Sequence, residues 1–173
     1  MHRVLALLIA LSIAVVSCSS DRPREGNEPD DETPIVLGSP TVPGSPTFGV
    51  GTILIDGADE GPILLQGEVA DTDETRSFGL MGREEIPDDY GMVFIMFEER
   101  DCCFYMKDTL IPLSVAFFDK GGTIVDIVDM EPCEEDPCQL FSSRKPYTGA
   151  LEVKQGQFDV WGVSIGDRIR VVQ

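Results

Sequence analysis

The residues of this sequence that could bind a ligand or do chemistry are mainly charged, and most of these are acidic. The chain has 13 lysine and arginine residues against 31 aspartate and glutamate residues. Cations that occur against such a balance indicate defined partners, either internal carboxylates or a small anionic ligand. With their neighbouring side chains they form the predicted ligand-binding set, which comprises Arg83, Met106, Lys107, Asp108, Thr109, Asp119 and Glu152.

Catalysis by these residues is the weaker interpretation. Asp108 and Asp119 would be the paired carboxylates of a hydrolase, but the stretch from Asp119 to Gly122 is first of all typical of a hairpin turn. The single histidine is His2, which excludes Ser-His-Asp chemistry, Cys-His chemistry and histidine-ligated zinc from the folded region. We therefore assign no catalytic residue, and we expect neither a metal nor another cofactor.

Cysteines are the second informative group. Besides Cys18 the sequence has four of them, and an even number is typical of disulfides in an exported protein. A bridge between Cys133 and Cys138 would close a short acidic loop and stabilise the fold by about 2 kcal/mol. A redox-active pair and a metal site are the alternatives. For Cys102 and Cys103 three outcomes stay open: a bridge between these neighbours, one cross-link to that loop with a free thiol left, or two free thiols.

The start of the chain predicts export and lipid attachment. A positive start at His2-Arg3 precedes an apolar run over 4–16, which is too short to span a bilayer. The run leads into Ser17-Cys18, which resembles a bacterial lipobox, so we expect 1–17 to be a lipoprotein signal peptide and Cys18 to carry the lipid. An ordinary signal peptide with an incidental cysteine is the alternative.

The remaining sequence divides into a linker and one domain. Residues 18–47 are rich in proline, serine, aspartate and glutamate, a composition that cannot bury enough apolar surface to fold alone and favours an extended tether. Residues 48–173 carry short apolar runs separated by turn residues, which predict a β-rich domain. The sequence thus places a compact head at the end of a spacer.

The elements that must position the candidate residues are mostly strands. Strands are predicted at 50–55, 63–70, 92–97, 103–106, 113–119, 123–130, 150–153 and 168–172. A helix begins near Asp71 or Thr72, with Glu74 completing a capping box with Asp71, and runs to about Met81 before Gly82. A second helical turn is predicted over 158–162. The fold class is mostly β (α+β), a compact barrel-like or two-sheet domain with one short helix near its start.

A series of linked motifs runs through this domain. They are Arg76-Ser77-Phe78-Gly79-Leu80-Met81-Gly82-Arg83, Gly91-Met92-Val93-Phe94, Phe104-Tyr105-Met106-Lys107-Asp108-Thr109, Ala116-Phe117-Phe118-Asp119, Met130-Glu131-Pro132-Cys133, Ala150-Leu151-Glu152 and Gly166-Asp167-Arg168. The series resembles the family called domain of unknown function 192. The resemblance implies a small, mostly β domain, often exported, with no established biochemical role. The sequence departs from the family at Asp108, where asparagine is typical, and at Tyr105, where tryptophan is common.

These observations lead to one preferred function and two alternatives. We expect an extracytoplasmic lipoprotein, attached to the cell membrane by its lipid, that acts as a binding or accessory module for a small anionic ligand or an envelope protein. An envelope enzyme that uses carboxylates and Lys107 is one alternative, and a structural scaffold of an envelope complex is the other. The net charge of −18 excludes a strongly basic nucleic-acid binder.

Overall fold

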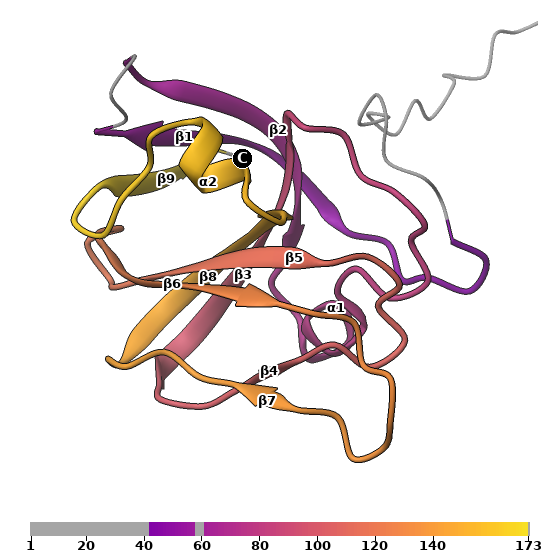
Figure 1. Cartoon of the computed structure of the whole chain (residues 1–173). Coiled ribbons are helices and arrows are strands. Elements are labelled where there is room, and N and C mark those ends of the chain that lie inside the picture. Colours follow the sequence, from indigo (N-terminus) through magenta and orange to yellow (C-terminus); the bar gives the residue numbers. More distant parts are fainter. Residues whose placement is uncertain (1–41, 58–60, 173) are drawn as a thin grey trace, which may run out of the picture. The chain divides into compact units, whose positions relative to one another are not determined.

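The computed structural model of the chain describes residues 42–57 and 61–172. The predicted signal peptide, Cys18 and most of the predicted linker lie outside the described residues. Seven strands form one curled sheet in the order β6-β5-β8-β3-β2-β1-β9 (Figure 1). Their bounds are β1 Gly49–Asp56, β2 Ile63–Ala70, β3 Tyr90–Arg100, β5 Leu113–Phe118, β6 Ile124–Met130, β8 Tyr147–Lys154 and β9 Arg168–Val172.

The sheet is antiparallel at every pairing except that of β2 with β3. Parallel neighbours need a crossover connection, and here the crossover carries the helix α1 (Asp73–Phe78). The two edges of the sheet also meet, because Thr123 bridges to Arg168. The amide of Ile169 donates to the carbonyl oxygen of Gly122 at 2.8 Å. This contact closes one end of the curl and makes the sheet barrel-like.

The sheet is covered on both faces at β5, because all residues of this strand are buried. Side chains alternate across a strand, so Ala116 and Phe118 join one core cluster whereas Val115 and Phe117 join another. The first cluster includes Phe158 of the short helix α2 (Gln157–Val160). The second cluster packs under the crossover and under a two-stranded sheet of β4 (Phe104–Tyr105) and β7 (Leu140–Phe141).

The fold class predicted from the sequence is confirmed, with corrections at element ends. The first helix is shorter than predicted: it ends at Phe78, and Gly79 with φ 50° is its C-cap in place of Gly82. Its capping box joins Thr72 and Thr75, not Asp71 and Glu74. Threonine replaces glutamate at the third helical position here because its hydroxyl reaches back to the amide of Thr72 at 3.0 Å.

The observed strand boundaries differ from the predicted ones where the alternation of apolar and polar side chains is weak. The β3 strand continues through a charged end to Arg100, and β8 begins already at Tyr147. The β7 strand was not predicted, since two residues give no period to detect. The predicted hairpin at Asp119 is present, and its carboxylate accepts from the amides of Gly121 and Thr123 at 2.8 and 2.9 Å. In the part of the chain that is described, no helix has the length and apolar character required to cross a membrane.

Candidate functional site

A cavity of about 340 Å³ opens on the second core cluster, between the crossover and the small sheet. Its walls come from four places: α1 with the turn that follows it, the distal half of β3, the segment at 102–109 that includes β4, and β8. Segments far apart in the sequence therefore meet here. A volume of this size is at the lower end of the range for small-molecule sites.

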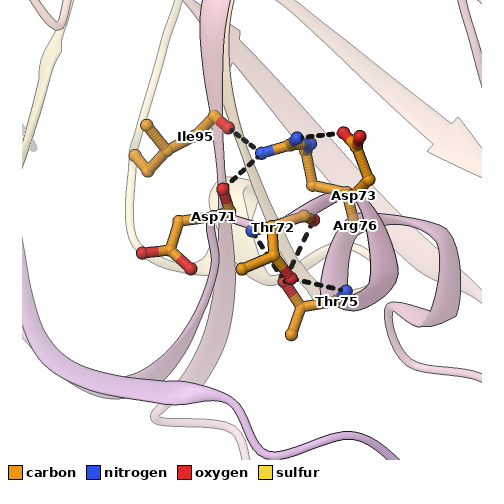
Figure 2. Close-up of polar contacts among 6 residues, drawn as sticks. All are labelled: Asp71, Thr72, Asp73, Thr75, Arg76 and Ile95. Carbon is orange, nitrogen blue, oxygen red and sulfur yellow. Dashed lines mark hydrogen bonds and ion pairs between the residues drawn. The ribbon is translucent and has the colours of Figure 1, made fainter.

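The α1 wall is fixed by hydrogen bonds at both ends of the helix. Figure 2 shows Thr72 and Thr75 exchanging bonds at the N-terminus, where the Thr75 amide donates to the Thr72 hydroxyl at 3.1 Å. Arg76 clamps the helix to the sheet, because its guanidinium donates to the carbonyl oxygens of Asp71 at 2.6 Å and Ile95 at 2.9 Å, and to the Asp73 carboxylate (Figure 2). The guanidinium of Arg76 thus joins this wall to β3.

Aromatic rings form much of the remaining lining. Phe94 and Phe104 meet edge to face with centroids 5.1 Å apart, and Phe104 lies 6.3 Å from Tyr147. The Tyr147 hydroxyl donates to the carbonyl oxygen of Cys102 at 3.0 Å. Burial raises the pKa of Tyr147 to about 12, so its phenol stays neutral near neutral pH.

Glu152 is the one acid that is buried beside this cavity. It lies in β8 between Met92 of β3 and Val115 of β5, and its side chain is 5% exposed. Within the described residues its carboxyl group forms no hydrogen bond and no ion pair. Burial raises the pKa of Glu152 to about 8, because an apolar environment disfavours the charged form. A carboxylic acid that is protonated at neutral pH can donate or accept a hydrogen bond, or can become a carboxylate opposite a bound cation.

Two further features border the cavity on the side of β4. Cys102 and Cys103 are joined by a disulfide between adjacent residues, the first of the three outcomes that the sequence left open. The Ser142 hydroxyl donates to Cys103 Sγ at 3.3 Å. Thr109 is buried at the same wall, with its hydroxyl 3.4 Å from the carbonyl oxygen of Lys107.

Cys133 and Cys138 form the second disulfide, with Cα atoms 5.4 Å apart.

Arg83 belongs to a polar cluster and not to the cavity wall. Its guanidinium is buried, donates to the Tyr90 hydroxyl at 2.9 Å and forms an ion pair with Glu68. The guanidinium carbon also lies 5.9 Å from the ring of Phe48. The sequence predicted either an internal carboxylate or an anionic ligand as the partner of Arg83. In the structure the partner is an internal carboxylate, that of Glu68.

The other predicted site residues divide between surface, turn and core. Thr109 and Glu152 meet at the cavity, whereas Lys107 is exposed and is not part of its wall. Asp108 is exposed with φ 55°, and its carbonyl oxygen accepts from the amide of Gly82 at 2.8 Å. Asparagine and aspartate tolerate this left-handed conformation, which accounts for either residue at that position. The remaining two are Met106 in the second core cluster and Asp119 in its hairpin.

Sequence reasoning missed the aromatic residues of the cavity. Phe94, Phe104 and Tyr147 occur within apolar strand patterns, so their types signalled only a core. The described residues contain no group of three or more histidine, cysteine, aspartate or glutamate side chains that could hold a metal ion. The cavity therefore presents one buried acid, Glu152, beside aromatic rings and the arginines Arg76 and Arg100.

Fold and site together define a class of protein: a small barrel-like β domain with an acid-containing aromatic cavity on the outer face of its sheet. The model of the family DUF192, described as an uncharacterized ACR, matches residues 56–171, and the chain belongs to this family. No match was found among the curated proteins.

Solved structures of bacterial proteins share the fold. A proposed transcription regulator from Sinorhizobium meliloti 1021 is 30% identical, with a TM-score of 0.67 over 74% of this chain and 98% of that one. A protein of unknown function from Novosphingobium aromaticivorans DSM 12444 is 24% identical, with a TM-score of 0.67 over 78% of this chain and 94% of that one. The second likeness concerns the fold alone.

Proposed function

We propose that this protein is a binding module that takes a small molecule into the cavity beside Glu152. We further propose that it works outside the cytoplasmic membrane, with lipid on Cys18 and residues 18–47 as its tether. The first part is supported by the cavity, and the second by the sequence at the start of the chain.

The observation that carries the binding proposal is the isolated carboxyl group of Glu152. A buried polar group without a partner destabilises a fold by about 1–3 kcal/mol, and an ionised one by more. A methionine or leucine of similar size would pack there at no such cost. A costly acid that borders a cavity is the pattern expected of a ligand site, because the ligand supplies the missing partner.

Binding is tested by a thermal-shift screen of small molecules against the full chain. Ligands that bind only the folded state raise the melting temperature. We expect hits whose shift disappears in Glu152→Gln and persists in Glu134→Gln, a matched change in the exposed loop between Cys133 and Cys138. Hits that stabilise wild type and Glu152→Gln equally would contradict a site at Glu152, and turnover of a hit would favour the enzyme alternative.

The anchor is tested separately by mass spectrometry of the mature amino terminus. We expect the membrane fraction to contain chains that begin at Cys18 and carry acyl groups, and Cys18→Ala to lose this fraction. An unmodified thiol at Cys18 would refute the anchor and would leave the cavity proposal untouched, since the two depend on different residues.

A further inference from the structure

The cavity also indicates which class of ligand it accepts. We propose that the ligand is an organic cation, whose ammonium group is held by the carboxylate of Glu152 and by the surrounding aromatic rings. This inference rests on the proposed binding function and adds the chemistry of the ligand. It differs from the anionic ligand expected from the sequence. Of the cations behind that expectation, Arg83 and Lys107 do not border the cavity, and Arg76 is bonded within the protein.

The rings supply the first half of the argument. Phe78, Phe94, Phe104, Tyr105 and Tyr147 all border the cavity. An ammonium group within about 6 Å of a ring centroid is attracted by the negative face of the ring. Neutral apolar ligands gain only burial from such a lining, whereas a cation gains burial of its alkyl groups and attraction to the rings. Aromatic walls alone would accept either a neutral apolar ligand or a cation, so the carboxyl group of Glu152 decides between the two.

Glu152 supplies the second half. Its side chain is buried at the cavity wall, and its carboxyl group has no partner among the described residues. A buried carboxylate needs a compensating positive charge. An ammonium group would satisfy that need, and its N–H groups, where present, would form charge-assisted hydrogen bonds to the oxygens.

The cations already present near the cavity do not fill this role. Arg76 is bonded to two backbone carbonyl oxygens and to Asp73, so its donors are directed into the protein frame. Arg100 is exposed at the end of β3 and forms no ion pair among the described residues. Glu68 and Arg83 lie on the same face across Met92, but they pair with each other.

A metal ion is a poorer match than an organic cation. Magnesium and calcium take several oxygen ligands, and the described residues offer no cluster of three metal-binding side chains. The cavity is large enough for a small molecule. The net charge of −18 also raises the local concentration of cations at the protein surface.

Two probes of equal shape test the proposal on the full chain. Choline carries a fixed positive charge, and 3,3-dimethylbutan-1-ol replaces its nitrogen by carbon. We expect choline to bind at least tenfold more tightly than the alcohol, measured by NMR titration. Glu152→Gln should weaken choline binding at least tenfold and leave the alcohol unchanged, whereas Glu134→Gln should change neither. Tyr105→Leu, a change at a half-exposed ring, should weaken choline binding about threefold.

The pH dependence provides a readout that a merely structural role of Glu152 would not alter. Choline does not titrate, so its binding requires only that Glu152 lose its proton. Affinity should therefore rise about tenfold per pH unit below about pH 8 and level off above it. The charged and titratable groups that border the cavity with Glu152 are Asp73, Arg76, Arg100, Tyr105 and Tyr147. Burial raises the pKa of Tyr147 to about 12, which is far above this range.

The outcomes separate the two proposals. If the alcohol, or the anion 3,3-dimethylbutanoate, binds at the cavity as tightly as choline, the cation is refuted and the binding function stands. Choline binding that is unchanged in Glu152→Gln also refutes the cation site. If neither the probes nor the thermal-shift library bind, both proposals fail together.

Discussion

Asp126 and Glu152 are both buried acids of the large sheet, and their surroundings are opposite. Asp126 in β6 is 0% exposed and accepts hydrogen bonds from the Arg144 amide at 2.8 Å, from the Arg144 guanidinium and from the amide of Ile127 at 3.1 Å. Glu152 is 5% exposed and has no such donor among the described residues. Hydrogen bonds from Arg144 lower the pKa of Asp126, whereas burial raises that of Glu152 to about 8.

A structural acid and a ligand-binding acid can be distinguished by whether the protein itself supplies partners for the carboxyl group. Asp126 fastens β6 to the segment that leads into β8, and its charge is fully compensated within the protein. Glu152 lies at the wall of a cavity and has no partner for its carboxyl group among the described residues. Both acids have a small exposed fraction, and their partners distinguish the two roles. The contrast also predicts opposite responses to pH.

The largest expected effect is the loss of a pH-dependent destabilisation in Glu152→Gln. Glutamate ionises near pH 4.5 in the unfolded chain and near pH 8 in the folded protein, so the folded state binds one more proton across this window. Stability therefore falls as pH rises through the window, by about 5 kcal/mol in total. The variant cannot titrate at this position and should lack that fall. Urea unfolding at pH 4.5 and at pH 9 measures it, and identical pH profiles for both proteins would break the comparison.

The next effect is expected at Asp126. In Asp126→Asn an amide group with two donors faces the donors of Arg144, so we expect a loss of about 3 kcal/mol in unfolding free energy at pH 7. The lowered pKa of Asp126 means that its contribution is present above the unfolded value near 3.8 and is lost as pH falls below it. Wild type and variant should therefore converge in strong acid. A deficit that persists there would show that shape, and not charge, makes Asp126 important.

The smallest effect concerns an exposed carboxylate that serves as a reference for the two buried ones. Asp108 has φ 55° and an exposed side chain, so its charge should contribute little. We expect Asp108→Asn to change the unfolding free energy by less than about 0.5 kcal/mol, and Asp108→Ala to cost about 1 kcal/mol because alanine tolerates the left-handed region less well. Chemical denaturation measures both. A large effect of Asp108→Asn would mean that the charge itself is used.

Much of the fold could be predicted because it depends on local patterns. Strands β2 and β9 have the predicted bounds, since alternation and turn residues mark their ends. The hairpin at Asp119 was also recognisable, because an aspartate followed by glycines bonds its own backbone. The end of α1 was predicted wrongly because Gly79 and Gly82 both have positive φ and either could end the helix. The helix ends at Gly79, where the backbone packs against the ring of Phe94.

Residue types and their spacing along the chain were enough to predict the β-rich class, the family and the acidic balance. Only the tertiary structure decided that Glu152 and Thr109 share a cavity while Arg83 pairs with Glu68. It also decided that Asp126 is compensated and Glu152 is not. The physical reason is that the pKa and the role of an acid depend on groups brought close by strand pairing, and strand pairing joins residues that the sequence keeps far apart.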